Sequence, residues 1–352
     1  MSIFSINGIA IKGISCCVPE KIEYNTDLSL LNKDEIEKYI QATGVKQRRI
    51  ISNNLCTSDL CLEAAKNLIK GLKWKNEEIE ILVFISQTPD YILPNTATIL
   101  QHKLNLPKSC LAFDLTLGCS GYVYGLSVIS SLMKASKIKK GLLLAGDTIS
   151  KIVSKKDKTT FPLFGDAGSA TGIELLENSS TLFFDLGSDG EGYQAIIVPD
   201  GGSRNKFQYK SLESKMHDDG IERNNCNLII EGMDVFSFGI TYVPKNINNL
   251  LSFYSIDKEK IDFFIFHQAN MMMNKMIVKK LKLPAEKVPF SLNNFGNTSS
   301  ASIPLTIVSE LNDNLLNQKK DILLSGFGVG LSWGCVFVNN CKIDFLGLTE
   351  IN

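Results

Sequence analysis

Short, uninterrupted apolar runs alternate along the chain with longer segments in which apolar residues recur at helical spacing. The runs at 141–146 and 261–266 are rich in Leu, Ile and Phe. Runs of this length suit strands that are buried on both faces of a mostly parallel sheet. Residues 121–136 have helical apolar spacing and no internal proline, so we expect a helix there. The pattern predicts a layered α/β architecture.

The pattern also repeats within the chain. Three segments of the first half resemble three of the second in the same order: EIEILVFISQ and EKIDFFIFHQ, HKLNLP and KKLKLP, and KKGLLLAGD and KKDILLSGF. Each unit reads as strand, helix, strand, glycine-containing turn, helix and strand. Internal similarity of this kind indicates a duplicated structure. We predict two halves, 1–175 and 176–352, with two sheets and with helices between and outside them.

One polar segment, 201–227, has no counterpart in the first half. It carries many charged residues and shows little periodicity. Segments of this kind usually run over the protein surface, so we expect a surface excursion.

Composition narrows the class of protein. Lys plus Arg and Asp plus Glu both number 37, and this balance lacks the basic excess that indicates a nucleic-acid partner. The apolar runs are far shorter than the ~20 residues of a membrane helix, so we expect no membrane partner. Residues 1–16 carry no basic region followed by a long apolar block and a cleavage site. We interpret them as a strand of the mature protein and not as a signal peptide.

Nine cysteines and three histidines limit the metal and redox chemistry. Most of the cysteines stand inside apolar stretches, and no CxxC pair occurs. A disulfide framework belongs to small secreted chains, and a Cys/His metal site needs clustered ligands. We therefore expect free thiols in a reducing cytoplasm, no metal site and no cofactor. Only Cys119 invites a functional interpretation.

The repeat brings three polar residues to comparable places. Cys119 lies twelve residues after Pro107, and Asn297 lies thirteen residues after Pro284. Each is therefore expected just after a strand and at the start of a helix. His267 directly follows the second apolar run. Because α/β sheets usually place their sites at the carboxyl ends of strands, we predict that the three side chains meet in one cleft.

The chemistry of these three residues is complementary. A thiol at a helix N-terminus is expected to favour the thiolate, which attacks acyl carbons well. A histidine can act as a base, and an asparagine amide can hold an oxyanion or enolate oxygen. Taken singly, Cys119 also fits core packing, His267 a structural histidine and Asn297 a helix cap. Their matched positions in the repeat favour an acyl-transfer site.

At these residues the sequence resembles the β-ketoacyl-acyl-carrier-protein (ACP) synthase III family, which has the thiolase fold. The similarity runs along nearly the whole chain. It is carried by ATGVKQRR, the GCSG turn, LFGDAGSA, EGMDVF, FHQAN, NFGNTSSASIP and GFGVGLSWG. The resemblance implies a duplicated, five-layered αβαβα structure with two mixed sheets. Cys119 belongs to the first thiolase-like half, and His267 and Asn297 belong to the second.

The resemblance also implies a reaction. Cys119 would take an acyl primer from a thioester of coenzyme A or of ACP. His267 and Asn297 would hold the carbonyl of malonyl-ACP while CO₂ leaves, and the enolate would attack the acyl-Cys119 carbonyl. The product would be a 3-oxoacyl-ACP, in fatty-acid or specialised acyl-chain synthesis. The oxyanion hole would combine the backbone amides of Cys119 and Val329, where the family commonly has glycine at the second position.

Other residues take their roles only from this resemblance. Gly232, Phe236 and Asn270 match positions that line the pantetheine tunnel. A homodimer is implied, and Leu93 matches the residue that reaches the acyl pocket of the partner. ACP is the implied macromolecular partner, and no metal or cofactor is implied.

The chain departs from the family where housekeeping members bind coenzyme A. Lys38 and Ala42 align with a tryptophan and an arginine that hold the nucleotide. Met272 aligns with an arginine, and Ser237 with a basic residue. Lys158 keeps another nucleotide-contacting position. We hypothesise a specialised member whose primer is not acetyl-CoA, such as an acyl group already on a carrier protein.

Several other functions fit parts of the pattern. A papain-like hydrolase has Cys, His and Asn in the same chain order, but its fold has no place for the duplication. A thiolase needs a second cysteine, for which Cys335 is poorly placed, and a hydroxymethylglutaryl-CoA synthase needs a glutamate where Ser86 and Gln87 stand. A dinucleotide site needs GxGxxG, and Leu331 occupies its third glycine position. An alkylpyrone or alkylquinolone-type synthase and a non-catalytic partner subunit stay open.

Overall fold

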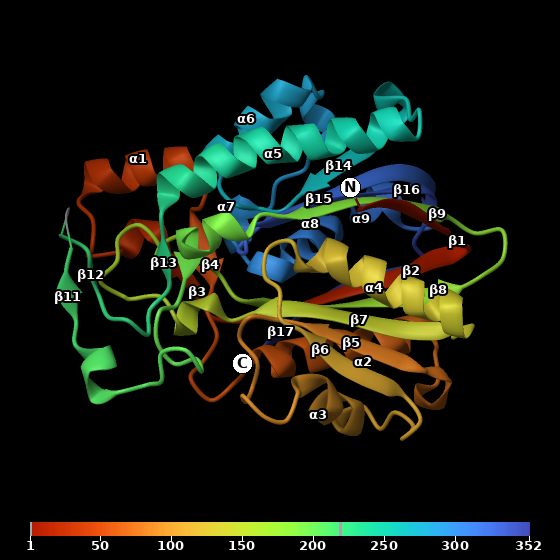
Figure 1. Cartoon of the computed structure of the whole chain (residues 1–352), viewed down its shortest axis with the longest axis horizontal. Helices are drawn as coiled ribbons and strands as arrows, with labels where there is room; N and C mark the ends of the chain where they lie inside the picture. Colours follow the sequence, from red (N-terminus) through yellow and green to blue (C-terminus); the bar gives the residue numbers. More distant parts are fainter. Residues whose placement is uncertain (1, 218–219) are drawn as a thin grey trace.

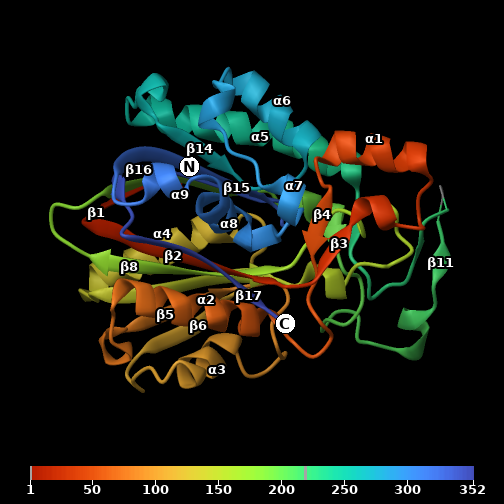
Figure 2. The same cartoon turned by 180° about the vertical axis from the view of Figure 1, so that it is seen from behind.

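Two stacked sheets, with helices between them and on both outer faces, form the body of the molecule (Figures 1 and 2). The computed structural model describes residues 2–217 and 220–352. The predicted five-layered αβαβα arrangement is confirmed. From the top of Figure 1 downwards, the helices of the three helical layers are α5 (Gly232–Phe253) and α6 (Met271–Leu281), then α4 (Gly121–Ser136) and α8 (Ser302–Glu310), then α2 (Thr57–Leu72) and α3 (Thr96–Lys103).

The first sheet is mixed and lies between the central helices and α2. Its pairs β17–β2, β7–β5 and β5–β6 are parallel, and β8 runs antiparallel to both of its neighbours. In spatial order its strands are β17 (Phe345–Ile351), β2 (Ile9–Pro19), β8 (Ala167–Leu175), β7 (Lys140–Asp147), β5 (Ile81–Ile85) and β6 (Leu111–Leu115).

The second sheet is also mixed and lies between the central helices and α5. Its strands in spatial order are β1 (Ser2–Asn7), β9 (Thr181–Ser188), β16 (Ser332–Lys342), β15 (Lys319–Gly328) and β14 (Phe263–Phe266). Only β14 and β15 pair in parallel among these strands. The expectation of mostly parallel sheets is therefore met only in part. Three residues connect β15 to β16, and so short a connection permits only antiparallel pairing.

The two terminal strands cross between the sheets. β1 pairs with β9 in the second sheet, and β17 pairs with β2 in the first. The residue boundary at 175/176 falls between β8 and β9, which lie in different sheets. We retain the two-half division as a proposal, in which each half contributes one terminal strand to the sheet of the other.

The segment before Asn297 differs from its counterpart before Cys119. We expected a strand there, but the described residues form the short helix α7 (Leu292–Phe295), after which Gly296 adopts a φ of 66°. Asn297 retains one isolated parallel bridge, to Phe164. Pro289 explains part of the difference, because proline has no N–H for a strand ladder.

Small elements gather at one end of the layers, at the left of Figure 1. They are α1 (Lys33–Thr43), β3 (Ile22–Tyr24), β4 (Gln47–Arg49), β10 (Ile196–Ile197), β11 (Lys215–Met216), β12 (Glu222–Arg223) and β13 (Ile229–Ile230). The remaining helix, α9 (Asn312–Leu315), follows α8. The polar segment 201–227 belongs to this end. Its residues 201–210 are exposed, as expected, but its later part forms cavity wall, as described below.

Candidate active site

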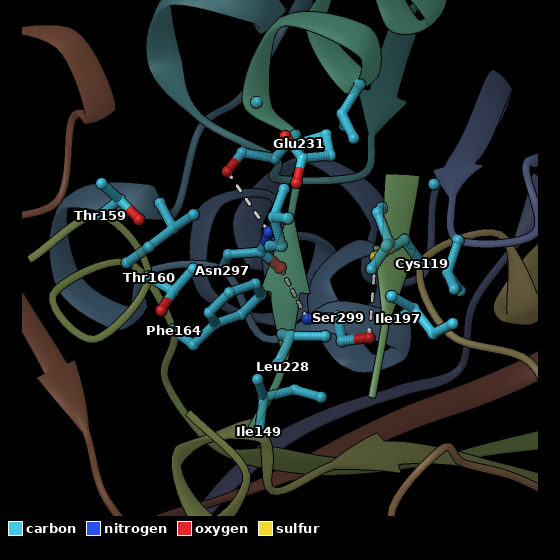
Figure 3. Close-up of a pocket in the computed structure, with 18 of the residues that line it drawn as sticks. Cys119, Ile149, Thr159, Thr160, Phe164, Ile197, Leu228, Glu231, Asn297 and Ser299 are labelled. Carbon is cyan, nitrogen blue, oxygen red and sulfur yellow. Dashed lines mark hydrogen bonds between the residues drawn. The ribbon is translucent and has the colours of Figure 1, made fainter. Parts of the chain in front are cut away.

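One cavity of about 720 Å³ connects the layered body with the small elements at its end. Six of the residues predicted from the sequence line it: Cys119, Gly232, His267, Asn270, Asn297 and Val329. Figure 3 shows the wall between Cys119 and Asn297, and the apolar side chains of Ile149, Phe164, Ile197 and Leu228 around it. The cavity thus combines a polar end at Cys119 with largely apolar walls.

Cys119 stands between β6 and α4, immediately before the N-cap residue Ser120. Its neighbour across the site is the β15 backbone at Gly328. A Cβ added there would lie 2.7 Å from the Cβ and 3.0 Å from the Sγ of Cys119. Real Cβ atoms do not approach so closely, so only glycine leaves room for the sulfur at this position.

Asn297 and Ser299 form a tight polar turn opposite the sulfur (Figure 3). The Asn297 Oδ1 accepts a hydrogen bond from the Ser299 backbone N–H at 2.9 Å, and its Nδ2 donates to the Ala269 carbonyl at 3.3 Å. The Ser299 Oγ lies 3.8 Å from the Cys119 Sγ. The turn therefore brings an amide and a hydroxyl to the same side of the thiol.

His267 follows β14 and is almost fully buried, with 2% of its surface exposed. Its backbone N–H donates to the Ser325 carbonyl, and its Nδ1 lies 2.7 Å from the Ser302 Oγ. The imidazole packs edge-on against Phe327, with ring centres 5.4 Å apart. The Ser302 contact holds the ring at Nδ1, and His267 lines the cavity.

The Cys119 thiol and the His267 imidazole are both neutral at rest. Burial raises the pKa of the Cys119 thiol to about 12, although the Ser299 hydroxyl opposes the shift. Burial also lowers the pKa of His267 to about 3. The sequence-based expectation of a stabilised thiolate is therefore wrong for the resting site, because loss of water outweighs the donors around the sulfur.

Two backbone amides also point their N–H groups at the Cys119 sulfur. The N–H groups of Cys119 and Val329 both face the sulfur, where they favour negative charge. The Val329 carbonyl accepts a hydrogen bond from the Ser332 hydroxyl at 2.7 Å, which fixes this peptide from behind. A valine at this position keeps its N–H, and its side chain packs beside Gly118.

Of the other residues predicted from the sequence, some line the cavity and others do not. Asn270 lines the cavity, but its Oδ1 caps α6 by accepting from the Met273 N–H at 2.9 Å. Phe236 is half-buried on α5 and Leu93 is 83% exposed, and neither is among the described residues that line the cavity. Met272, at the start of α6, is 53% exposed.

Several polar residues of the site were not identified from the sequence. Ser299 and Ser302 belong to the NTSSAS run that begins at Asn297, and this clustering of hydroxyls at a helix start was their only signal. His217 and Arg223 come from the segment 201–227, yet both line the cavity. A segment without periodicity gives no sign of which side chains turn inward, which explains the omission.

The fold and this constellation define a thiolase-fold condensing enzyme, an acyltransferase in which a cysteine, a histidine and an asparagine share one cavity. Two family models match the chain. "3-Oxoacyl-[acyl-carrier-protein (ACP)] synthase III" matches residues 113–190, and "3-Oxoacyl-[acyl-carrier-protein (ACP)] synthase III C terminal" matches residues 251–340.

Individual relatives extend this similarity to almost the full length. The β-ketoacyl-ACP synthase III of Streptococcus mutans is 33% identical over 91% of this chain and 96% of its own length. That of Fusobacterium nucleatum is 33% identical over 95% and 99%. The crystal structure of a 3-oxoacyl-ACP synthase from Burkholderia xenovorans superposes with a TM-score of 0.93, at 37% identity over 99% of each chain. The chain belongs to the 3-oxoacyl-ACP synthase III family.

Proposed function

We propose that the chain condenses an acyl primer with malonyl-ACP to give a 3-oxoacyl-ACP. The observation that carries this proposal is the shared cavity of Cys119, His267 and Asn297. The acyl group moves from the donor thioester to the Cys119 sulfur, and the donor leaves as a free thiol. Loss of CO₂ from the malonyl group then gives an enolate. The enolate attacks the acyl carbon and releases Cys119 as a thiolate, which takes up a proton from water to restore the resting thiol.

A proton must move during acyl loading, because the resting thiol is neutral. The raised pKa of Cys119 means that attack and deprotonation occur together. His267 is neutral at rest, so its free ring nitrogen is available to accept this proton and return it to the leaving thiol. The contact with Ser302 supports this assignment, because it holds the other nitrogen in place.

Negative charge then develops twice, and different donors serve each stage. We assign the amides of Cys119 and Val329 to the oxyanion formed at the acyl carbon. We assign Asn297 and His267 to the enolate oxygen of the malonyl thioester. The Asn297 Nδ2 donates only one long hydrogen bond, to the Ala269 carbonyl. Its second N–H is therefore available to the substrate.

The apolar part of the cavity fits the arm that carries both substrates. A pantetheine chain is long, narrow and largely uncharged, and it requires a tunnel of moderate polarity. We assign Gly232 and Asn270, which line the cavity, to this tunnel. Phe236, half-buried on α5, is assigned to it from the resemblance alone. A side chain at Gly232 would meet no atom within 4 Å, so this position borders open space.

The donor end differs from that of housekeeping members. Lys38, Ser237 and Met272 are exposed, and none reproduces the aromatic and arginine contacts that hold the coenzyme A nucleotide. The primer therefore arrives on a carrier protein, and the chain serves a specialised acyl pathway in the cytoplasm. All nine cysteines, which fall within the described residues, are free, as a reducing compartment requires. Among the described residues no helix is long and apolar enough to span a membrane.

A homodimer completes the acyl pocket in this proposal. β6 is an edge strand of the first sheet, and its Leu111 is 45% exposed. An exposed apolar edge strand is a ready template for pairing with another chain. Tyr91, Ile92 and Leu93 add a cluster of exposed apolar side chains, and Leu93 enters the pocket of the partner.

Acyl loading tests the proposal directly. The purified protein is incubated with acetyl-CoA and, separately, with ACP carrying short acyl chains, and the covalent adduct is measured by intact mass. We expect an adduct from acyl-ACP that is lost in Cys119→Ala. A Cys119-dependent adduct from acetyl-CoA of equal rate contradicts the specialised primer. Absence of a Cys119-dependent adduct from every donor overturns the enzymatic proposal and favours a non-catalytic partner subunit.

A further inference from the structure

Asp147 is a fully buried carboxylate at the end of β7, behind the candidate site. Its Oδ1 accepts hydrogen bonds from the Gln87 backbone N–H at 2.7 Å and from the Ser86 hydroxyl at 3.1 Å. Its Oδ2 accepts from the Ser300 hydroxyl at 2.8 Å and from the Ser300 backbone N–H at 3.2 Å. One side chain thus joins two loops that are more than two hundred residues apart in the chain.

The joined loops belong to different halves of the molecule. Ser86 and Gln87 follow β5 of the first sheet, whereas Ser300 belongs to the turn that carries Asn297 and Ser299. All of these donors are uncharged. A buried carboxylate held by uncharged donors alone is costly, so packing alone does not account for it.

The turn that Asp147 holds is conformationally demanding. Ser299 has a φ of 50°, in the left-handed region that residues other than glycine adopt only where their surroundings fix them. Its Oγ lies 3.8 Å from the Cys119 Sγ, and its N–H donates to Asn297. Ser300, the next residue, is the one that Asp147 binds through both backbone and side chain.

We propose that Asp147 is a positioning residue for the condensation: it holds the Ser299–Ser300 turn against the loop after β5. In this way it sets the place of Asn297 beside Cys119. The inference rests on the proposed function of Cys119 and Asn297, and it adds a group that contacts neither substrate.

The charge of Asp147 has a second consequence. Burial is the main reason that the pKa values of the Cys119 and Cys61 thiols are raised, and the negative charge of Asp147 adds to both shifts. The Ser299 hydroxyl and the amides of Cys119 and Val329 act in the opposite direction. Asp147 therefore places the donors, and its charge adds to the burial that keeps the sulfur protonated.

The substitution Asp147→Asn tests the positioning and the charge effect of Asp147, and two control variants distinguish them from general destabilisation. An amide offers one acceptor oxygen in place of two, so either the Gln87 or the Ser300 backbone N–H loses its partner. Asp166→Asn is the matched control, because Asp166 is equally buried and accepts from the Ile51 N–H at 2.9 Å and the Ser150 hydroxyl at 2.5 Å. Ser300→Ala is a second control, which removes one hydrogen bond but keeps the charge.

Two readouts are compared in all variants: condensation kinetics, and the pH dependence of Cys119 alkylation by iodoacetamide, followed by intact mass. Alkylation needs no condensation activity, so it stays informative if the proposed function fails. For Asp147→Asn we expect kcat to fall roughly ten- to a hundredfold, with KM nearly unchanged. Alkylation below the thiol pKa should accelerate by roughly threefold for each unit by which that pKa falls.

The outcomes distinguish the possibilities. Asp166→Asn should leave the alkylation profile unchanged, and Ser300→Ala should lower kcat without accelerating alkylation. The proposal is overturned if Asp147→Asn keeps wild-type kcat, or if it changes alkylation no more than Asp166→Asn. If alkylation responds as expected but no variant, including wild type, condenses any substrate, the proposed function fails and the electrostatic role of Asp147 stands.

Discussion

The Ser302 Oγ lies 2.7 Å from Nδ1 of His267, and both side chains are almost fully buried. Ser302 is the first residue of α8, so a central helix fixes the orientation of a ring that follows a strand of the second sheet. A neutral imidazole can act as a base only through the nitrogen that this contact leaves free. The helix therefore constrains the orientation of the His267 ring.

Loss of this contact should impair the reaction more than the fold. For Ser302→Ala we expect kcat to fall roughly five- to tenfold, which corresponds to one hydrogen bond of ordinary strength. Ser309→Ala is the matched control, because Ser309 lies on the same helix and its hydroxyl is buried without a partner among the described residues. Steady-state condensation kinetics and urea unfolding of both variants make the comparison. Equal losses of kcat in the two variants would contradict a specific role for Ser302.

Space beside the sulfur is equally critical. Gly328→Ala places a methyl group within 3.0 Å of the Cys119 Sγ, so the sulfur or the β15 backbone must move. Displacements of about 1 Å at a reacting atom cost roughly a hundredfold in rate, and we expect a loss of acyl loading of at least that order. The control is Gly202→Ala, at a position where a new Cβ meets nothing within 4 Å. Loading rates measured by intact mass should separate the two, and wild-type loading in Gly328→Ala would refute the close approach.

The burial of His267 should make stability depend on pH. Its native pKa of about 3 lies below the unfolded value of about 6.5. The unfolded chain therefore binds a proton between these values that the native protein does not. Above about pH 6.5 the imidazole is neutral in both states, so its titration does not change the free energy of unfolding. The native state loses stability as the pH falls from there toward 3.

His267→Gln removes this dependence, because glutamine does not titrate. Relative to the variant, the wild type should lose about 1.4 kcal/mol per pH unit within that window. Urea unfolding at about pH 7 and about pH 5 measures the difference. Asp166→Asn should give the opposite sign, since the native pKa of Asp166 is raised to about 6 by burial and its stabilisation is lost as the pH rises through that value. Parallel pH profiles of wild type and His267→Gln would show that the imidazole is not buried in its neutral form.

The sequence predicted the architecture where local pattern determines it. Apolar runs and the internal repeat indicated two sheets and a central helical layer, because burial on both faces leaves a clear hydrophobic signature. The pattern gave no information on which sheet receives β1 or β17. Strand pairing depends on contacts between distant segments. In an almost entirely buried strand such as β2, alternation does not mark even the face.

The site was predictable in its residues but not in its electrostatics. Cys119, His267 and Asn297 were identified from matched positions and from the resemblance, and all three line one cavity. The charge state of Cys119 was predicted wrongly, because helix position can be inferred from sequence whereas desolvation cannot. Asp147 also escaped notice, since a single acidic residue after a buried strand has no distinctive local pattern.

The exposed Met272 offers a gain-of-function test of donor choice. By the resemblance, it aligns with an arginine of housekeeping members. It lies at the start of α6, with 53% of its surface exposed. Met272→Arg should raise the rate of Cys119 loading from coenzyme A thioesters by roughly two- to tenfold at low salt, and less at high salt. Leu176→Arg adds the same charge on a distant turn and should have no effect. An increase that persists at about 1 M salt would indicate a cause other than attraction to the nucleotide phosphates.

Leu93 connects oligomeric state with primer selection. Its side chain is 83% exposed beside Ile92, which is 91% exposed, and such neighbouring apolar groups are usually covered in an assembly. Leu93→Asp should dissociate the proposed homodimer, because a carboxylate cannot be buried unpaired at low cost. Sedimentation velocity measures the change, with Phe253→Asp, at a 63% exposed position on the far end of α5, as the control.

Leu93→Ala should instead preserve the dimer and shift loading toward longer primers, by roughly ten- to two-hundredfold for each methylene that the wild-type pocket rejects. A monomeric wild type, or unchanged primer selection in a dimeric Leu93→Ala, would remove Leu93 from the acyl pocket.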